Sequence, residues 1–150
     1  MSLTDENITE CINYIKNSLY ISYDKDIIID PCAVKGILIK ELDGLVLYSF
    51  YYDVEANHPA IELLDFLTVD FQKFDKTILS GLWYDKVHII SYPSDLNALS
   101  YLQKCAEFAD TISFILLEKY ASITLVNYDL LFKKQIKDDY SVNIWKRKSI

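Results

Sequence analysis

Glycine and proline are scarce in this sequence, with three of each among 150 residues. Gly36, Gly44 and Gly81 lie too far apart to form a glycine-rich loop of the kind that holds phosphate groups. A β-sandwich with many tight turns would also need more of the residues that turns require. The sequence therefore disfavours both a glycine-loop nucleotide-binding enzyme and a turn-rich all-β fold.

Paired cysteines and long apolar runs are absent as well. Cys11, Cys32 and Cys105 are widely separated and form no Cys-x-x-Cys pair, which is typical of reduced thiols in the cytosol. Apolar runs such as Ile112–Leu117 are much shorter than the roughly 20 residues that cross a bilayer. No apolar leader with a cleavage site opens the chain. We therefore expect a cytoplasmic protein with no membrane insertion.

Histidines, the commonest acid–base residues, number only two. His58 precedes Pro59 at a predicted helix start, where a solvated or capping role is expected. His88 lies in a predicted strand on the face opposite Val87 and Ile89, which predicts an exposed position. Neither has a partner at zinc-ligand spacing. The histidines therefore indicate no catalytic or metal site.

Carboxylates give no clear site either. Asp24, Asp26 and Asp30 are spaced like calcium ligands, but the segment lacks the central glycine and terminal glutamate of a calcium loop. Glu62 and Asp65 share a predicted helix face, where solvated side chains are expected. The sequence therefore predicts no catalytic residue, no metal, no cofactor and no enzymatic activity.

Basic charge is in deficit, since 15 Lys and Arg face 22 Asp and Glu, a net charge of −7. Residues 1–75 hold 14 acidic and 5 basic side chains, whereas residues 76–150 hold 8 and 10. Nucleic-acid binding is disfavoured because it needs a basic surface. The acidic half either keeps the protein soluble or attracts a basic protein partner, and charge alone does not separate these alternatives.

The first half of the chain predicts a helix and then three strands. Apolar residues at helical spacing, from Ile8 to Leu19, predict an amphipathic helix over residues 5–19. Residues 20–30 are rich in β-formers. Two β-rich runs, Val34–Leu42 and Leu45–Tyr52, flank Asp43-Gly44, a dipeptide suited to a tight hairpin turn with positive φ.

The second half predicts a helix over residues 60–74, two strands at Thr77–Trp83 and Lys86–Tyr92, and a long helix from Asp95 to about Tyr120. The predicted order is α-β-β-β-α-β-β-α, with residues 121–150 as a possible C-terminal extension. Short connections between consecutive strands favour an antiparallel sheet with helices on it. We therefore expect one α+β domain over residues 1–150.

Aromatic side chains are abundant, with 12 Tyr, 7 Phe and 2 Trp. Apolar residues occupy both faces of the predicted strand Leu45–Tyr52, although a hairpin with one solvated face should alternate with polar residues. Tyr and Trp are also favoured at protein interfaces. The sequence therefore predicts a partner-binding surface with Tyr48, Phe50 and Tyr52 as its anchors.

The predicted order of elements resembles that of the class I type III secretion chaperones. The resemblance is carried by residues 60–118, where "AIELLDFLTVDFQKF" is similar to the family's middle helix and "LNALSYLQKCAEFADTISFILLEK" to its closing helix. It implies a cytoplasmic homodimer that holds an extended N-terminal segment of a secreted effector. The wide apolar stripe of the predicted last helix is consistent with a homodimer.

Two alternatives stay open. Small size, acidity and abundant Tyr also fit an immunity protein that neutralises a basic, nuclease-type toxin. A longin-like or roadblock-like regulatory module shares the hairpin-then-helix pattern, but it usually has three strands after that helix, and only two are predicted here.

Overall fold

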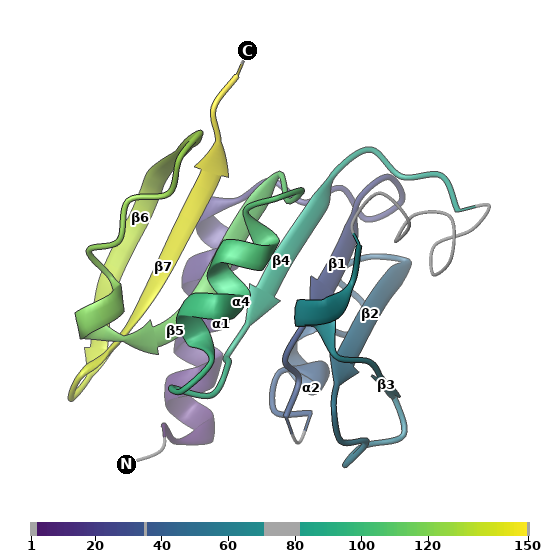
Figure 1. The fold of residues 1–150 in the computed structure, drawn as a ribbon, viewed down its shortest axis with the longest axis horizontal. Coiled ribbons are helices and arrows are strands. Elements are labelled where there is room, and N and C mark those ends of the chain that lie inside the picture. Colours follow the sequence, from purple (N-terminus) through teal and green to yellow (C-terminus); the bar gives the residue numbers. More distant parts are fainter. Residues whose placement is uncertain (1–2, 35, 71–81, 150) are drawn as a thin grey trace.

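The strands form one mixed sheet in the computed structural model, which describes residues 3–34, 36–70 and 82–149. Within these residues the sheet has seven strands in the order β3-β2-β1-β4-β5-β7-β6 (Figure 1). The strands from β3 to β5 in this order are parallel, and β7 runs antiparallel to both β5 and β6. Their bounds are β1 Ile27–Asp30, β2 Tyr48–Asp53, β3 Ile61–Leu63, β4 Val87–Ser91, β5 Thr111–Leu117, β6 Tyr128–Lys137 and β7 Tyr140–Arg147.

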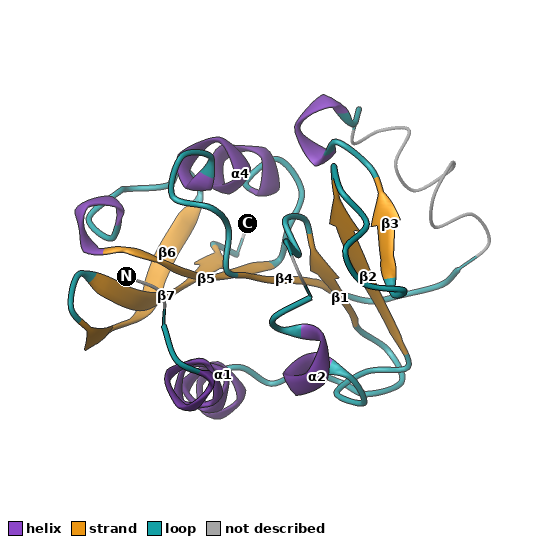
Figure 2. Ribbon diagram, turned by 90° about the horizontal axis from the view of Figure 1, so that it is seen from below, coloured by secondary structure: helices purple, strands orange, loops and turns teal. Residues whose placement is uncertain are grey.

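Helices cover both faces of the sheet. Figure 2 shows α1 (Asp5–Ser18) and α2 (Ile39–Leu42) below the sheet and α4 (Ala98–Cys105) above it. Short 3₁₀ helices follow β3 (Phe66–Thr68) and β5 (Glu118–Tyr120). A mostly parallel sheet with helices on both faces is the doubly wound α/β architecture. The predicted antiparallel α+β fold is therefore wrong.

The predicted first helix is confirmed, because its local signals agree with its packing. The Thr4 hydroxyl accepts the backbone N–H of Asn7, and the Asn7 side chain accepts the Thr4 N–H, which forms a capping box. Ile8, Ile12 and Ile15 are buried at helical spacing. They pack on the lower face of the sheet together with Ile28 of β1.

The predicted hairpin around Asp43-Gly44 is wrong, although the backbone prediction at Gly44 holds. Gly44 has the expected positive φ of +86°, but it lies in the turn that follows α2, directly after the C-cap residue Asp43. The strand after it, β2, pairs in parallel with β1, with Ile27 opposite Tyr48. The turn chemistry fits a helix C-terminus as well as a hairpin, and nonlocal pairing with β1 decides between them.

The predicted long helix over residues 95–120 is also wrong. The chain forms α4, ends that helix at Cys105 and then forms β5. All but the last residue of β5 is buried, because the strand lies between β4 and β7 with both faces covered. A short continuous apolar run fits a buried strand and a buried helix equally well, so its periodicity could not separate them.

The remaining predicted elements have mixed outcomes. The strand at Lys86–Tyr92 is confirmed as β4, whereas residues 60–70 form β3 and a 3₁₀ turn in place of a helix. Residues 71–74 and most of the strand predicted at Thr77–Trp83 lie outside the described residues. The possible extension over residues 121–150 contains β6 and β7, which belong to the sheet. Within the described residues, no helix is long and apolar enough to cross a membrane.

Candidate functional site at the carboxyl edge of the sheet

The sheet has a switch point at β1. After β1 the chain passes through α2 to β2 on one side, while β4 lies on the other side of β1. In open α/β sheets, ligands bind in the crevice that this divergence leaves beyond the carboxyl ends of the strands. The last residues of β1, β2 and β4 are Asp30, Asp53 and Ser91, and all three are polar and buried.

Asp30 links the carboxyl ends of β1 and β4. Its Oδ1 accepts a hydrogen bond from the Ser91 hydroxyl at 2.5 Å and another from the Cys32 backbone N–H at 3.2 Å. The side chain is almost fully buried, and burial raises the pKa of Asp30 to about 7. A carboxyl group that titrates near neutrality at a switch point is a common feature of functional sites.

Asp53 holds the loop that follows β1. Its Oδ2 accepts the Val34 backbone N–H at 2.6 Å, and its Oδ1 accepts the Val54 backbone N–H at 2.7 Å. The Ala33 N–H donates to the Tyr52 carbonyl at 2.9 Å. The carboxylate therefore fastens the β1 loop to the end of β2.

The loop itself has an uncommon backbone. Val34 has φ of +53° and Gly36 has φ of +80°. A Cβ at Gly36 would lie 3.0 Å from the His58 ring, so the close approach of these two segments requires glycine there. A positive φ is unfavourable for a β-branched residue, and the hydrogen bond to Asp53 offsets part of that cost at Val34.

A cavity of about 350 Å³ opens beside this loop. Val34 forms one wall, and Tyr92 and Tyr140 form another, with their rings packed edge to face at 5.8 Å. Tyr140 donates its hydroxyl to Asp95 at 3.2 Å. Among the described residues that line the cavity there is no Lys or Arg, while Asp5 and Asp95 are both present. The cavity therefore suits a neutral or cationic ligand group.

The three cysteine thiols are buried in the structure. Cys32, in the β1 loop, is buried, and burial raises its pKa to about 11. Cys11 and Cys105 are also free and buried. All three thiols therefore pack in the interior of the protein.

The predicted partner-binding residues lie on β2, away from this cavity. Tyr48 is 53% exposed, Phe50 is half-buried and Tyr52 is 1% exposed. Phe50 and Tyr52 stack at 6.5 Å in the upper core, while Tyr51 packs in the lower core. Aromatic residues occupy both faces of the strand because helices or loops cover both faces. Partner binding through Tyr48, Phe50 and Tyr52 stays a prediction.

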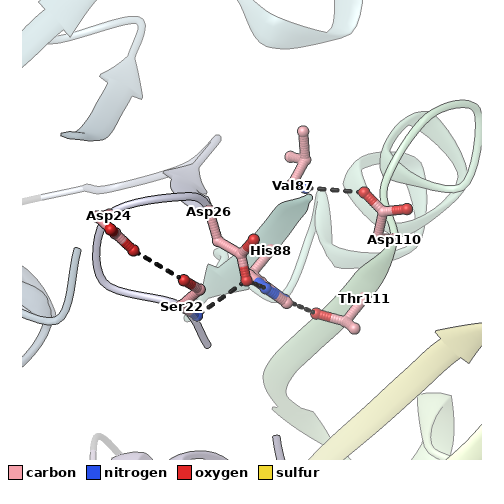
Figure 3. A network of polar contacts seen from close by, with 7 residues as sticks. All are labelled: Ser22, Asp24, Asp26, Val87, His88, Asp110 and Thr111. Carbon is pink, nitrogen blue, oxygen red and sulfur yellow. Dashed lines mark hydrogen bonds and ion pairs between the residues drawn. The ribbon is translucent and has the colours of Figure 1, made fainter. Parts of the chain in front are cut away.

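His88 lies in a buried polar network at the opposite, amino edge of the sheet, so the predicted exposed position is wrong. Its Nε2 lies 2.8 Å from Asp26 Oδ2, and its Nδ1 lies 2.8 Å from Thr111 Oγ1 (Figure 3). His88 is 1% exposed because β4 is a central strand. His58 does cap locally as expected, with its Nδ1 accepting the Ala60 N–H, but the segment enters β3 and not a helix.

Sequence reasoning missed Asp30 and Asp53 as site residues. A strand followed by a loop with a glycine and a short helix is a pattern that could have indicated the site. In this pattern Asp30 ends the first strand, and Asp53, 23 positions later, ends the next strand. A single glycine in the loop hid this pattern. The predicted hairpin then assigned the loop to the wrong element.

Comparisons with known proteins identify the fold. No family model matches the sequence, and no curated protein matches it. The 23S rRNA methyltransferase ErmE superposes with a TM-score of 0.61 and 11% identity, over 98% of this chain and 69% of ErmE. The rRNA methyltransferase AviRa from Streptomyces viridochromogenes gives 0.62 and 11%, over 97% of this chain and 86% of AviRa.

A third solved structure, the ribosomal protein L11 methylase from Lactobacillus delbrueckii subsp. bulgaricus, gives a TM-score of 0.60 and 8% identity. That superposition covers 99% of this chain and 81% of the methylase. At these identities the similarity establishes a shared fold. The chain therefore has the methyltransferase-like, Rossmann-type α/β fold of these proteins.

These findings overturn the functional predictions from sequence. The chain does not have the fold of a type III secretion chaperone. The segment that was similar to the family's closing helix forms α4 and then the strand β5. The expected homodimer was based on this resemblance and on the apolar stripe of the predicted last helix, and neither agrees with the structure. The immunity-protein alternative, the absence of enzymatic activity and the exclusion of nucleic acid are likewise contradicted, because the structural neighbours are methyltransferases, two of them acting on rRNA.

Proposed function

We propose that this protein is a methyltransferase that binds S-adenosylmethionine at the carboxyl edge of its sheet and methylates RNA. The observation that carries the proposal is the pair of buried carboxylates, Asp30 and Asp53, at the two strand ends that hold the β1 loop. This pair lies at the switch point of a fold that the chain shares with known methyltransferases.

The residues present fit this methyl donor. Its sulfonium group is cationic, and the adjacent cavity has Asp5 and Asp95 in its lining. A carboxylate at the end of β2 is the group that binds ribose hydroxyls in dinucleotide-binding α/β folds, and Asp53 occupies that place. The cavity volume of about 350 Å³ lies within the usual range for small-molecule sites.

When bound, the donor would supply an electrophilic methyl group on a positively charged sulfur. The side chains of this protein would bind and orient the reactants. Ser91 and Asp30 fix the end of β4, from which Tyr92 enters the cavity wall. Tyr92 and Tyr140 provide flat apolar surfaces that exclude water and can stack on a base. Positioning of this kind contributes much of the rate enhancement in group transfer.

RNA is the acceptor class that the structural neighbours support, since ErmE and AviRa are rRNA methyltransferases. The overall charge of −7 does not favour RNA binding, so a local basic surface must supply the attraction. Cytoplasmic location is part of the proposal, because all three cysteines are free.

Calorimetric titration of the full chain with S-adenosylmethionine tests donor binding. We expect saturable binding by the unaltered protein and at least about tenfold weaker binding by Asp53→Asn, because the variant loses the charge that the loop and ribose share. Glu10→Gln, which removes an exposed carboxylate on α1, is the matched control and should bind normally. Absence of binding at millimolar donor, or equal affinities in both variants, would contradict the proposal.

A further inference from the structure

A second pocket lies at the amino edge of the sheet, opposite the carboxyl-edge site. It has a volume of about 440 Å³. Because β7 is antiparallel to β5, the end of β7 lies beside the start of β5, with Lys146 opposite Thr111. The lining residues that matter here come from the starts of β4 and β5 and from the end of β7: Lys86, His88, Thr111, Lys146, Arg147 and Lys148.

The rim of this pocket is basic on an otherwise acidic protein. Lys86 and Lys146 are exposed, and among the described residues neither forms an ion pair with a carboxylate. Lys148 lies 3.8 Å from Asp129 and is largely exposed. Asp110 is the acidic residue of the lining, and its Oδ2 is engaged by the Val87 backbone N–H at 2.8 Å.

Arg147 is fixed in place by several contacts. Its Nε donates to the Ala109 carbonyl at 3.1 Å, and one terminal nitrogen donates to the Tyr128 hydroxyl at 2.8 Å. The guanidinium carbon also lies 5.0 Å from the centre of the Tyr128 ring. The pocket therefore has one rigid cation and two lysines that can adjust to a ligand.

The floor of the pocket is formed by buried polar side chains that belong to the network drawn in Figure 3. His88 and Thr111 line it, and both belong to the network with Asp26. Asp26 Oδ2 also accepts the Ser22 backbone N–H at 3.0 Å, so this carboxylate oxygen contacts both Ser22 and His88. Burying three polar side chains at a strand edge is costly unless they are paired, and here each has a partner.

We propose that this amino-edge pocket binds a phosphate group of an RNA chain. The inference rests on the proposed function for its choice of RNA, and it adds a contact that the donor site does not supply. The seven residues of β5 separate the two edges by about 20 Å, so a single RNA strand can reach both. A lysine pair beside a fixed arginine is a suitable receptor for phosphate oxygens.

Fluorescence anisotropy with a short single-stranded RNA tests the pocket on the full chain. The test variant is Lys86→Gln/Lys146→Gln. The matched control is Lys40→Gln/Lys119→Gln, which removes the same charge from exposed lysines outside the pocket. We expect the test variant to bind RNA about tenfold more weakly near physiological salt, and its log–log salt slope to fall by about 0.7, as for one lost phosphate contact on a single strand.

The control variant should bind RNA like the unaltered protein. Equal losses of RNA affinity in the two variants would contradict phosphate binding at the pocket, because they would show that affinity depends on net charge alone. Displacement of the RNA by equimolar adenosine monophosphate would assign the pocket to free nucleotides and overturn the RNA assignment.

Donor titration of the same variants separates the two proposals. Unchanged donor affinity with weakened RNA binding supports a distinct site. RNA binding at the pocket without any donor binding would overturn the proposed methyl transfer and leave the pocket standing.

Discussion

The Ser91 hydroxyl at the end of β4 donates a 2.5 Å hydrogen bond to the carboxyl group of Asp30 at the end of β1, although 61 residues separate them in the chain. This contact ties together the two strands that border the switch point. Asp30 in turn accepts the N–H of Cys32, so the same carboxyl group also sets the start of the β1 loop. The proposed donor site is therefore built on buried polar contacts between strands.

Asp30 makes folding stability depend on pH. Burial raises its pKa from 3.8 to about 7 in the folded protein. Between these values the unfolded chain has lost the proton and the folded protein keeps it, so stability falls as pH rises and levels off above about 7. The full change is about 4 kcal/mol. Thermal melts at several pH values measure this change. The stability of Asp30→Asn should decrease much less with rising pH than that of the unaltered protein, and equal pH profiles would show that Asp30 does not titrate as described.

Gly36 and Gly44 provide a matched pair for the loop. Both have positive φ, but only at Gly36 would an added Cβ meet neighbouring side chains, the His58 ring and the Ile39 Cδ1 atom, each at 3.0 Å. Gly44→Ala should cost about 1 kcal/mol from backbone strain, and Gly36→Ala should cost at least about 2 kcal/mol, because it adds a steric clash. Urea unfolding measures both values. Equal costs would indicate that the approach of His58 does not constrain the loop.

Thr111→Val tests the buried network at the amino edge. The change removes the hydroxyl that hydrogen-bonds His88 at 2.8 Å and leaves a buried ring nitrogen without its partner. We expect a loss of about 1–3 kcal/mol in the free energy of unfolding. Thr124→Val, at an exposed position, is the control and should change stability by less than about 0.5 kcal/mol. Similar values for the two variants would refute the network.

Tyr48 and Tyr52 lie on the same strand, β2, but Tyr48 is exposed and Tyr52 is buried. Tyr52→Ala should destabilise the protein by about 3–5 kcal/mol, because the side chain is fully buried against Phe66, with ring centres 6.1 Å apart. Tyr48→Ala should cost little, since more than half of that side chain is exposed. Thermal melts distinguish them, and a large loss in Tyr48→Ala would mean that the assigned exposure is wrong.

The sequence predicted elements whose local signals agree with their packing. The spacing of Ile8, Ile12 and Ile15 predicts a helix from the local sequence alone. The run Ile27–Ile29 before Pro31 likewise predicts a strand, and both elements are present. Gly44 predicted a positive φ correctly. These features depend on neighbours within a few residues.

The errors arise where nonlocal packing decides the structure. Thr111–Leu117 is a strand only because β4 and β7 flank it, and His88 is buried only because β4 is central. Asp30 and Asp53 become a site only when β1 and β2 pair in parallel, which places both strand ends at one edge. The predicted hairpin does not pair β1 with β2, so it does not bring Asp30 and Asp53 together. The functional interpretation was wrong because it was based on this topology.

Hydrogen–deuterium exchange of the full chain with and without S-adenosylmethionine tests the central claim most directly. The proposal predicts slower exchange at the amides that hold the carboxyl-edge loops, at Cys32–Val34 and Val54–Glu55. It predicts no change at the amino edge around Val87 and Asp110. Unchanged exchange throughout, or protection confined to the amino edge, would contradict a donor site at the switch point.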